Sequence, residues 1–278
     1  MTWKEELKSF EWITYIFVLA LGLVAMVVVL AANIPDRQIF LGDAALWRSQ
    51  NEDTVPTWLA MVFMAVVSVL LAGVEYATCL RSNPSRAAYA TARVWLGFVM
   101  MNILTFVFTG LLKIYVAEPR PDFLSRCFGA SQVPPQQYST EQFSSNAACD
   151  PSAEASLLRG GRQAWPSGHA SSTLASAFFF ACYAWWRTRK QPAFVSQLVW
   201  SGGVATLILA FFIGASRIVN NKHSTADVCS GFLIGALSSL AYLVPLIHSM
   251  DSRYYPKPRK HDASSSSSAS APLFAEDE

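Results

Sequence analysis

Six long apolar stretches constrain the fold of this chain more than any other feature. Each is long enough to cross a hydrocarbon core of about 30 Å as a helix. Backbone polar groups in lipid must be satisfied within each segment, so the stretches are predicted to be helices rather than strands. They are Trp12–Asn33, Thr57–Leu80, Val94–Leu112, Gly168–Trp186, Ala193–Ala215 and Val228–Ile247, and only the second contains a charge, Glu75.

The composition agrees with a membrane protein. Of the 278 residues 53% are hydrophobic and 14% are charged, whereas soluble domains carry about 25% charged residues. The net charge of +2 and the lack of a basic tract give no sign of a nucleic-acid partner. Lys4 and Lys8 precede the first apolar run without a cleavage site, so this run is predicted to stay in the membrane. We therefore predict an all-α integral membrane bundle of six transmembrane helices.

The lysines and arginines predict its orientation, because cytoplasmic segments carry an excess of both residues. If the N-terminus lies inside, the cytoplasmic segments hold twelve of the 21 basic residues. Both termini are then cytoplasmic, in the plasma membrane or an endomembrane such as the endoplasmic reticulum, Golgi or vacuole. The twelve residues are Lys4, Lys8, Arg81, Arg86, Arg93, Arg187, Arg189, Lys190, Arg253, Lys257, Arg259 and Lys260.

The domain organisation follows from a change in composition near residue 249. Residues 1–249 contain all six apolar stretches and form the predicted membrane domain. Residues 250–278 are first basic and proline-containing, then rich in serine and alanine, then acidic. Such a segment is typical of a disordered tail, which is predicted to be cytoplasmic.

Three polar clusters flank the predicted helices, all on the non-cytoplasmic side. KIYVAEPRP ends the third helix, WPSGHAS opens the fourth, and SRIVNNKHSTAD connects the fifth to the sixth. In an alternating topology these connections share one face, so the clusters can meet. Their candidate residues are Lys113, Arg120, Ser167, Gly168, His169, Arg217, His223 and Asp227.

Five of these residues have the chemistry of an anion site. Lys113, Arg120 and Arg217 would gather three cations, and arginine's planar fork suits phosphate oxygens. Ser167 and Gly168 stand where the fourth helix begins, and helix N-termini favour anions. The sequence therefore predicts a phosphate cradle at this face.

The remaining three residues fit acid–base and nucleophilic chemistry. His223 and Asp227 are four residues apart, so on a helix they share a face. The carboxylate can hold one imidazole nitrogen protonated and leave the other free as a nucleophile. His169 is then available as a general acid for the leaving oxygen. Together with the cradle, this set indicates phosphoryl transfer.

Each cluster taken alone also has a structural explanation. Lys113 and Arg120 could reach for a membrane interface, PSGH could simply start a helix, and His223 with Asp227 could be a structural pair. Glu75 is a separate case, because an ionisable residue within a transmembrane segment is a functional candidate by default. It lies towards the cytoplasmic end of its helix, so we predict a structural or interfacial role.

The three clusters together resemble the signature of the type-2 phosphatidic acid phosphatase superfamily, at every signature position. Within it the chain resembles lipid phosphate phosphatases, including fungal diacylglycerol pyrophosphate phosphatases. KIYVAEPRPDFLSRC and FLGDAALWRSQNEDTVPTWL carry this narrower likeness, and the resemblance covers roughly residues 36–245. One departure is the lack of an external glycosylation sequon, because the Asn-x-Ser at Asn83 has Pro84 in its middle.

This resemblance implies a role for each candidate residue. His223 would attack phosphorus and form a phosphohistidine that water hydrolyses. Asp227 would orient His223, and His169 would protonate the leaving group. The phosphate would be held by Lys113, Arg120, Ser167, Gly168 and Arg217.

The expected activity is Mg-independent hydrolysis of lipid phosphate monoesters, without a cofactor. Phosphatidate, lysophosphatidate, related lipid phosphates and diacylglycerol pyrophosphate are the expected substrates, and membrane lipids the expected surroundings. The external face offers few carboxylates for a metal, while three cations can neutralise phosphoryl charge. A polyprenyl pyrophosphate or sphingoid-base phosphate phosphatase, or a non-catalytic lipid-binding relative, remain alternatives. No oligomeric state is predicted.

The cysteines give a further expectation. Cys127 and Cys149 are the two cysteines on the non-cytoplasmic side, where disulfides persist. We predict that they form a disulfide across the long external loop, with a pair of free thiols as the alternative. The five cysteines lack the spacing of a zinc site, so no metal is expected.

Overall fold

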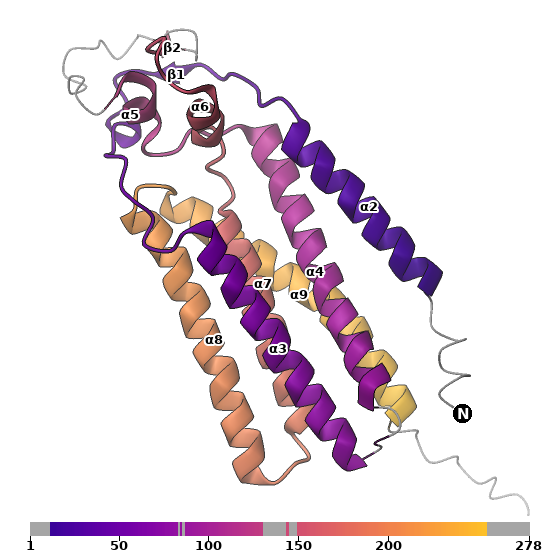
Figure 1. The fold of residues 1–278 in the computed structure, drawn as a ribbon. Coiled ribbons are helices and arrows are strands. Elements are labelled where there is room, and N and C mark those ends of the chain that lie inside the picture. Colours follow the sequence, from indigo (N-terminus) through magenta and orange to yellow (C-terminus); the bar gives the residue numbers. More distant parts are fainter. Residues whose placement is uncertain (1–11, 83, 85–86, 130–142, 145–148, 255–278) are drawn as a thin grey trace, which may run out of the picture.

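The computed structural model describes residues 12–82, 84, 87–129, 143–144 and 149–254. They form a bundle of long helices with a small cap of short elements at one end (Figure 1). Each predicted apolar stretch corresponds to one long helix, and the helices are α2 (Trp12–Ala31), α3 (Thr57–Ser82), α4 (Ala87–Val116), α7 (Gly168–Thr188), α8 (Ala193–Val219) and α9 (Thr225–Tyr254).

Within the described residues, four helices are long and apolar enough to cross a membrane. These are Thr57–Arg81, Ala87–Val116, Ala193–Val219 and Thr225–Met250. The apolar part of α2 is shorter, Ile16–Ala31. α9 continues to Tyr254, past the predicted domain boundary at residue 249, and residues 255–278 of the predicted tail lie outside the described residues.

α7 is the central helix, and it packs against α3, α4, α8 and α9. The contact with α9 is close because two glycines of α9 face the backbone of α7. A Cβ atom at Gly231 would lie 2.6 Å from the carbonyl oxygen of Ser167, and one at Gly235 would meet the carbonyl oxygen of Ser171. Small residues let helix backbones approach in this way. A larger residue at Gly231 would push the start of α9 away from the start of α7.

The cap consists of the segments between α2 and α3 and between α4 and α7. It adds two short strands to the expected all-α fold, β1 (Ile39–Phe40) and β2 (Phe143–Ser144), paired antiparallel. It also contains the 3-10 turn η1 (Ala44–Leu46), α5 (Phe123–Phe128) and α6 (Ala155–Gly161). Its own apolar core includes Leu46, Phe123 and Leu124, and a disulfide joins Cys127 to Cys149.

Candidate active site

The predicted site residues come from four helix ends at the capped end of the bundle (Figure 1). Lys113 lies in the last turn of α4 and Arg217 in the last turn of α8. Ser167 precedes α7, and Asp227 is in the first turn of α9. The polar terminal turns of four long helices therefore lie in the same region of the molecule.

The start of α7 is held by two contacts. Ser167 is the N-cap: its hydroxyl accepts from the backbone N–H of Ala170 at 3.5 Å. Its own N–H donates to the backbone carbonyl of Asp227 at 2.9 Å, which ties the start of α7 to the start of α9. A Cβ atom on Gly168 would lie 3.8 Å from Cε of Lys113. The structure therefore brings Lys113 over the first turn of α7, where free backbone N–H groups favour an anion.

His223 and Asp227 meet at the turn between α8 and α9. Nδ1 of His223 lies 3.4 Å from Oδ2 of Asp227, somewhat longer than an ordinary hydrogen bond. Ser224 forms a reciprocal cap with Asp227: the N–H of Ser224 donates to Oδ2 at 2.8 Å, and the N–H of Asp227 donates to the Ser224 hydroxyl at 3.1 Å. This capping box fixes the carboxylate beside the imidazole.

Burial sets the protonation state of His223. The side chain is almost inaccessible, which disfavours a charged ring and lowers its pKa from the ordinary value of 6.5. The charges of Lys113 and Arg120 lower the pKa further, while Asp227 acts in the opposite direction. A lowered pKa leaves the ring neutral at pH 7, and the neutral ring carries the lone pair of a nucleophile.

The two arginines differ in how they are held. Arg217 donates to the carbonyl of Val55 at 3.1 Å and pairs with Asp53 at 3.0 Å, both in the segment between α2 and α3. Arg120 lies just before α5, and its backbone N–H donates to the backbone carbonyl of Gly161 at 2.7 Å. Burial lowers the pKa of Arg120 to about 10, which still leaves the guanidinium charged at neutral pH.

Lys113 is held by the chain that precedes α7. Its Nζ donates to the backbone carbonyl of Gln163 at 2.5 Å and to that of Ala164 at 3.5 Å. The charges of Lys113, Arg120 and Arg217 all act on His169. The three predicted cations and His169 therefore share one electrostatic environment.

Several buried polar atoms in this region lack a hydrogen-bond partner within the described part of the chain. They are Nε of Arg120, Nε of Arg217, Nε2 of His169, Nδ1 of His223 and Oδ1 of Asp227. Buried polar groups are nearly always paired, so a cluster of unpaired ones calls for an explanation. The guanidinium nitrogens of Arg120 and Arg217 are donors, so they are suited to hold an anion with several oxygens beside the neutral His223 ring. The carboxylate oxygen of Asp227 can only accept, so it is not part of such an anion site.

A buried network beside the site was missed from the sequence. The carboxylate of Asp122 accepts two hydrogen bonds from Arg126, at 2.8 and 2.7 Å, and pairs with Lys222 at 3.1 Å. This carboxylate links the segment after Arg120 to the residue before His223. The i,i+4 spacing of Asp122 and Arg126 was a readable signal. The partners of Lys222 and Arg217 come from distant segments, and nothing local in the sequence indicates them.

Glu75 lies at the other end of the bundle, away from these residues. Its carboxylate is buried and accepts from the Tyr183 hydroxyl and from Nε of Arg187, both at 2.6 Å. The Cys79 thiol donates to it at 3.0 Å. These contacts join α3 to α7, as a structural role requires.

Comparison with known families gives a match to the PAP2 superfamily over residues 94–249, more than half of the chain. The matched segment includes all three polar clusters. No solved structure matches the chain.

The chain is also similar to curated proteins. Probable lipid phosphate phosphatase 4 of Arabidopsis thaliana is 29% identical over 202 residues, which cover 69% of this chain and 58% of that protein. Lipid phosphate phosphatase 1 of the same plant is 28% identical over 67% of this chain and 53% of that protein. Probable diacylglycerol pyrophosphate phosphatase 1 of Schizosaccharomyces pombe is 27% identical over 54% of this chain and 51% of that protein. The chain thus spans less than two thirds of the length of these relatives.

Proposed function

Because the chain belongs to the PAP2 superfamily, we propose that it is a membrane phosphatase that removes phosphate from lipid phosphate monoesters. The observation that carries this proposal is the set of buried, unpaired guanidinium and imidazole nitrogens beside the His223–Asp227 pair. The names of the similar proteins, lipid phosphate phosphatases and a diacylglycerol pyrophosphate phosphatase, support lipid phosphates as the substrate class.

In the proposed binding step, the phosphate enters the cradle as an anion. Lys113, Arg120 and Arg217 neutralise its oxygens, and the backbone N–H groups at Ser167 and Gly168 add donors. Three fixed cations offer the charge stabilisation that a metal ion supplies elsewhere, so the reaction is proposed to need no Mg²⁺.

In the first chemical step, Nε2 of neutral His223 attacks phosphorus. An N–P bond forms, and the bond to the lipid oxygen breaks. The leaving alkoxide takes a proton from His169, so the products are a free lipid alcohol and a phosphohistidine. Negative charge brought by the phosphate offsets the cations around His169 and favours its protonated form. Asp227 stabilises the positive charge that develops on the His223 ring.

In the second step, water replaces the alcohol. His169, now neutral, accepts a proton from the attacking water, the N–P bond breaks, and inorganic phosphate leaves. Both histidines return to their starting states, so the cycle balances with one water consumed per phosphate released.

The membrane arrangement is also part of the proposal. We place all six long helices across the bilayer, with both termini cytoplasmic and the site on the external or lumenal face. α7 falls below the hydropathy of the other spans because it carries many small and hydroxyl side chains. Ser171, Thr173 and Ser176 are fully buried among the neighbouring helices, so they do not meet lipid.

The experiment that tests this function is phosphate release by the purified full-length protein in detergent. The panel contains phosphatidate, lysophosphatidate, a sphingoid-base phosphate and a polyprenyl pyrophosphate, each with and without EDTA. Release from phosphatidate should persist in EDTA and stop with vanadate, which adopts the trigonal-bipyramidal geometry of the transition state. Loss of release on chelation, restored by Mg²⁺, would contradict the proposed mechanism.

A further inference from the structure

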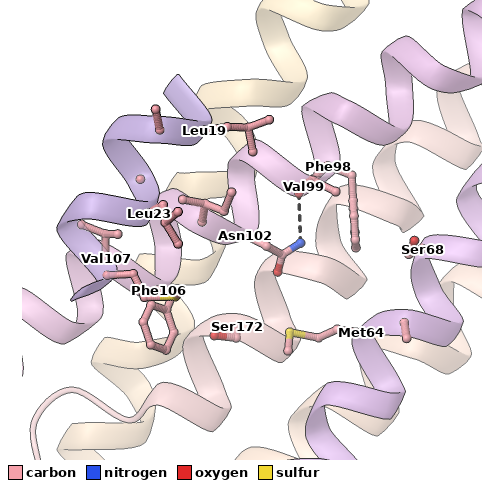
Figure 2. A pocket seen from close by; sticks show the side chains of 15 residues that line it. Leu19, Leu23, Met64, Ser68, Phe98, Val99, Asn102, Phe106, Val107 and Ser172 are labelled. Carbon is pink, nitrogen blue, oxygen red and sulfur yellow. Dashed lines mark hydrogen bonds between the residues drawn. The ribbon is translucent and has the colours of Figure 1, made fainter. Parts of the chain in front are cut away.

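A cavity of about 610 Å³ that is open to the outside of the bundle lies among α2, α3, α4 and α7 (Figure 2). Leu19 and Leu23 of α2 and Phe106 and Val107 of α4 contribute to its wall, and Ser172 of α7 lies at one side. Its volume is in the range of about 300 to 1,000 Å³ that is usual for sites of small organic ligands.

The wall offers an incoming ligand apolar surface. Asn102 donates to the carbonyl of Phe98 at 3.0 Å and accepts from the Ser176 hydroxyl at 2.9 Å, as Figure 2 shows in part. The Ser68 hydroxyl accepts from the indole N–H of Trp95 at 2.8 Å. These polar groups already have partners, so a ligand need not supply any. The cavity therefore suits an apolar chain without hydrogen-bonding groups.

The cavity shares α4 and α7 with the phosphate cradle and lies further along both helices. On α7, Ser172 comes three residues after His169, which is about 5 Å along the axis. On α4, the lining runs from Val107 down to Phe98, which is about 9 to 22 Å below Lys113. This apolar space thus lies about one to four helix turns below the cradle residues of α7 and α4.

The outer wall of the cavity is held in place at the cap. Arg159 of α6 donates to the backbone carbonyls of Ala32 and Leu30, at 2.7 and 3.0 Å, where α2 ends. Gly22 allows α2 to approach α4, because a Cβ atom at this position would meet the side chain of Ile103. These contacts fix the end of α2 that is nearest to the site.

We propose that this cavity binds one acyl chain of the same lipid whose phosphate occupies the cradle. The inference rests on the proposed function and adds to it a site for the substrate tail. Bilayer lipid is as apolar as the cavity wall, so moving the chain from one to the other gains little hydrophobic energy. The cavity acts through its shape: it favours chains that fill it, and it orients the phosphate ester beneath the cradle.

A pair of substitutions on α3 tests this proposal. Ala65 lines the cavity, whereas Ala77, twelve residues further along α3, lines a separate cavity of about 440 Å³. Both alanines are exposed, so a phenylalanine at either position changes the helix in the same way. The measured quantity is the ratio of kcat/KM for lysophosphatidate with an eighteen-carbon chain to that with a six-carbon chain. Ala65→Phe should lower this ratio about tenfold, and Ala77→Phe should leave it unchanged.

Photolabelling of the unsubstituted protein gives a second readout that does not depend on the folding of a variant. The probe is lysophosphatidate with a diazirine midway along its chain. Labelled peptides should come from residues 98–107 or 19–26, and labelling confined to residues 69–81 would overturn the proposal. Phosphate release with an unchanged ratio in a folded Ala65→Phe protein would also overturn it, while leaving the phosphatase function intact. Absence of release from both lipids in the unsubstituted protein would instead refute the function.

Discussion

Two buried clusters of charge stand at opposite ends of α7, about 28 Å apart along its axis. At one end, Glu75 has an arginine, a phenol and a thiol as partners. At the other, Arg120, Arg217, His169 and Asp227 each leave a buried polar atom without a partner in the described chain. We interpret the satisfied cluster as one that holds helices together and the unsatisfied one as the proposed ligand site. Hydrogen-bond satisfaction distinguishes the two clusters, whereas burial alone does not.

The largest difference between the clusters should appear when the nucleophile is removed. His223→Ala should lower kcat on phosphatidate by roughly 10⁴-fold or more, because the proposed mechanism assigns the covalent bond to phosphorus to His223. The thermal stability of this variant in detergent should stay close to that of the unsubstituted protein, since Ser224 still caps Asp227. Retention of more than a hundredth of the activity would show that His223 is not the nucleophile.

Removing the proposed general acid should have a smaller effect that depends on the substrate. His169→Ala should slow hydrolysis of phosphatidate by about 10² to 10⁴-fold. An aryl phosphate leaves as a stable phenolate and needs little protonation, so its hydrolysis should fall much less. Equal losses on both substrates would show that the two histidines do not have separate roles.

The positions of the helices and the first residues of α3, α7 and α8 could be predicted from the sequence, but the last residues of the helices could not. Hydropathy reports which residues can face lipid, so Val94–Leu112 was found while α4 begins at Ala87 and ends at Val116. The extra turns carry site residues, among them Lys113. Some helix caps have a sequence signal: Ser224 and Asp227, at the start of α9, have the spacing of a capping box.

The candidate site could be predicted as a set of residues, but its supports could not. The cradle residues stand in short motifs whose chemistry is visible in the sequence. Asp53 and Asp122 pair with Arg217 and Lys222 across more than ninety positions, and no local pattern links such residues. These contacts depend on how the cap folds over the bundle, which periodicity does not report.

A substitution in the Glu75 cluster should lower the stability of the protein and leave its activity unchanged, which is the opposite of the effect expected in the site. Glu75→Gln removes the charge that faces Arg187 and leaves a buried guanidinium without its counter-ion. Removing one partner of a buried pair costs about 3 to 5 kcal/mol, so thermal unfolding in detergent should occur at lower temperature. The kcat of the protein that remains folded should be unchanged, because the site lies at the other end of α7. A loss of kcat at full stability would assign Glu75 to function.

The smallest effect is expected from the disulfide between Cys127 and Cys149, which belongs to the cap and not to either cluster. The bond links residues 22 apart in the sequence. For a loop of this size, the chain-entropy model predicts that a disulfide stabilises the folded state by about 3 kcal/mol. In Cys127→Ser the cap should loosen, because the apolar core around Cys127 and Leu124 loses its covalent link. Arg120 and Asp122 lie just before α5, so KM for phosphatidate should rise several-fold while kcat changes little. Cys229 is a free and exposed cysteine on α9, so Cys229→Ser is the matched control and should change neither quantity.

Peptide mapping without reduction should recover Cys127 and Cys149 in one linked peptide, and alkylation of both thiols in the native protein would contradict the bond.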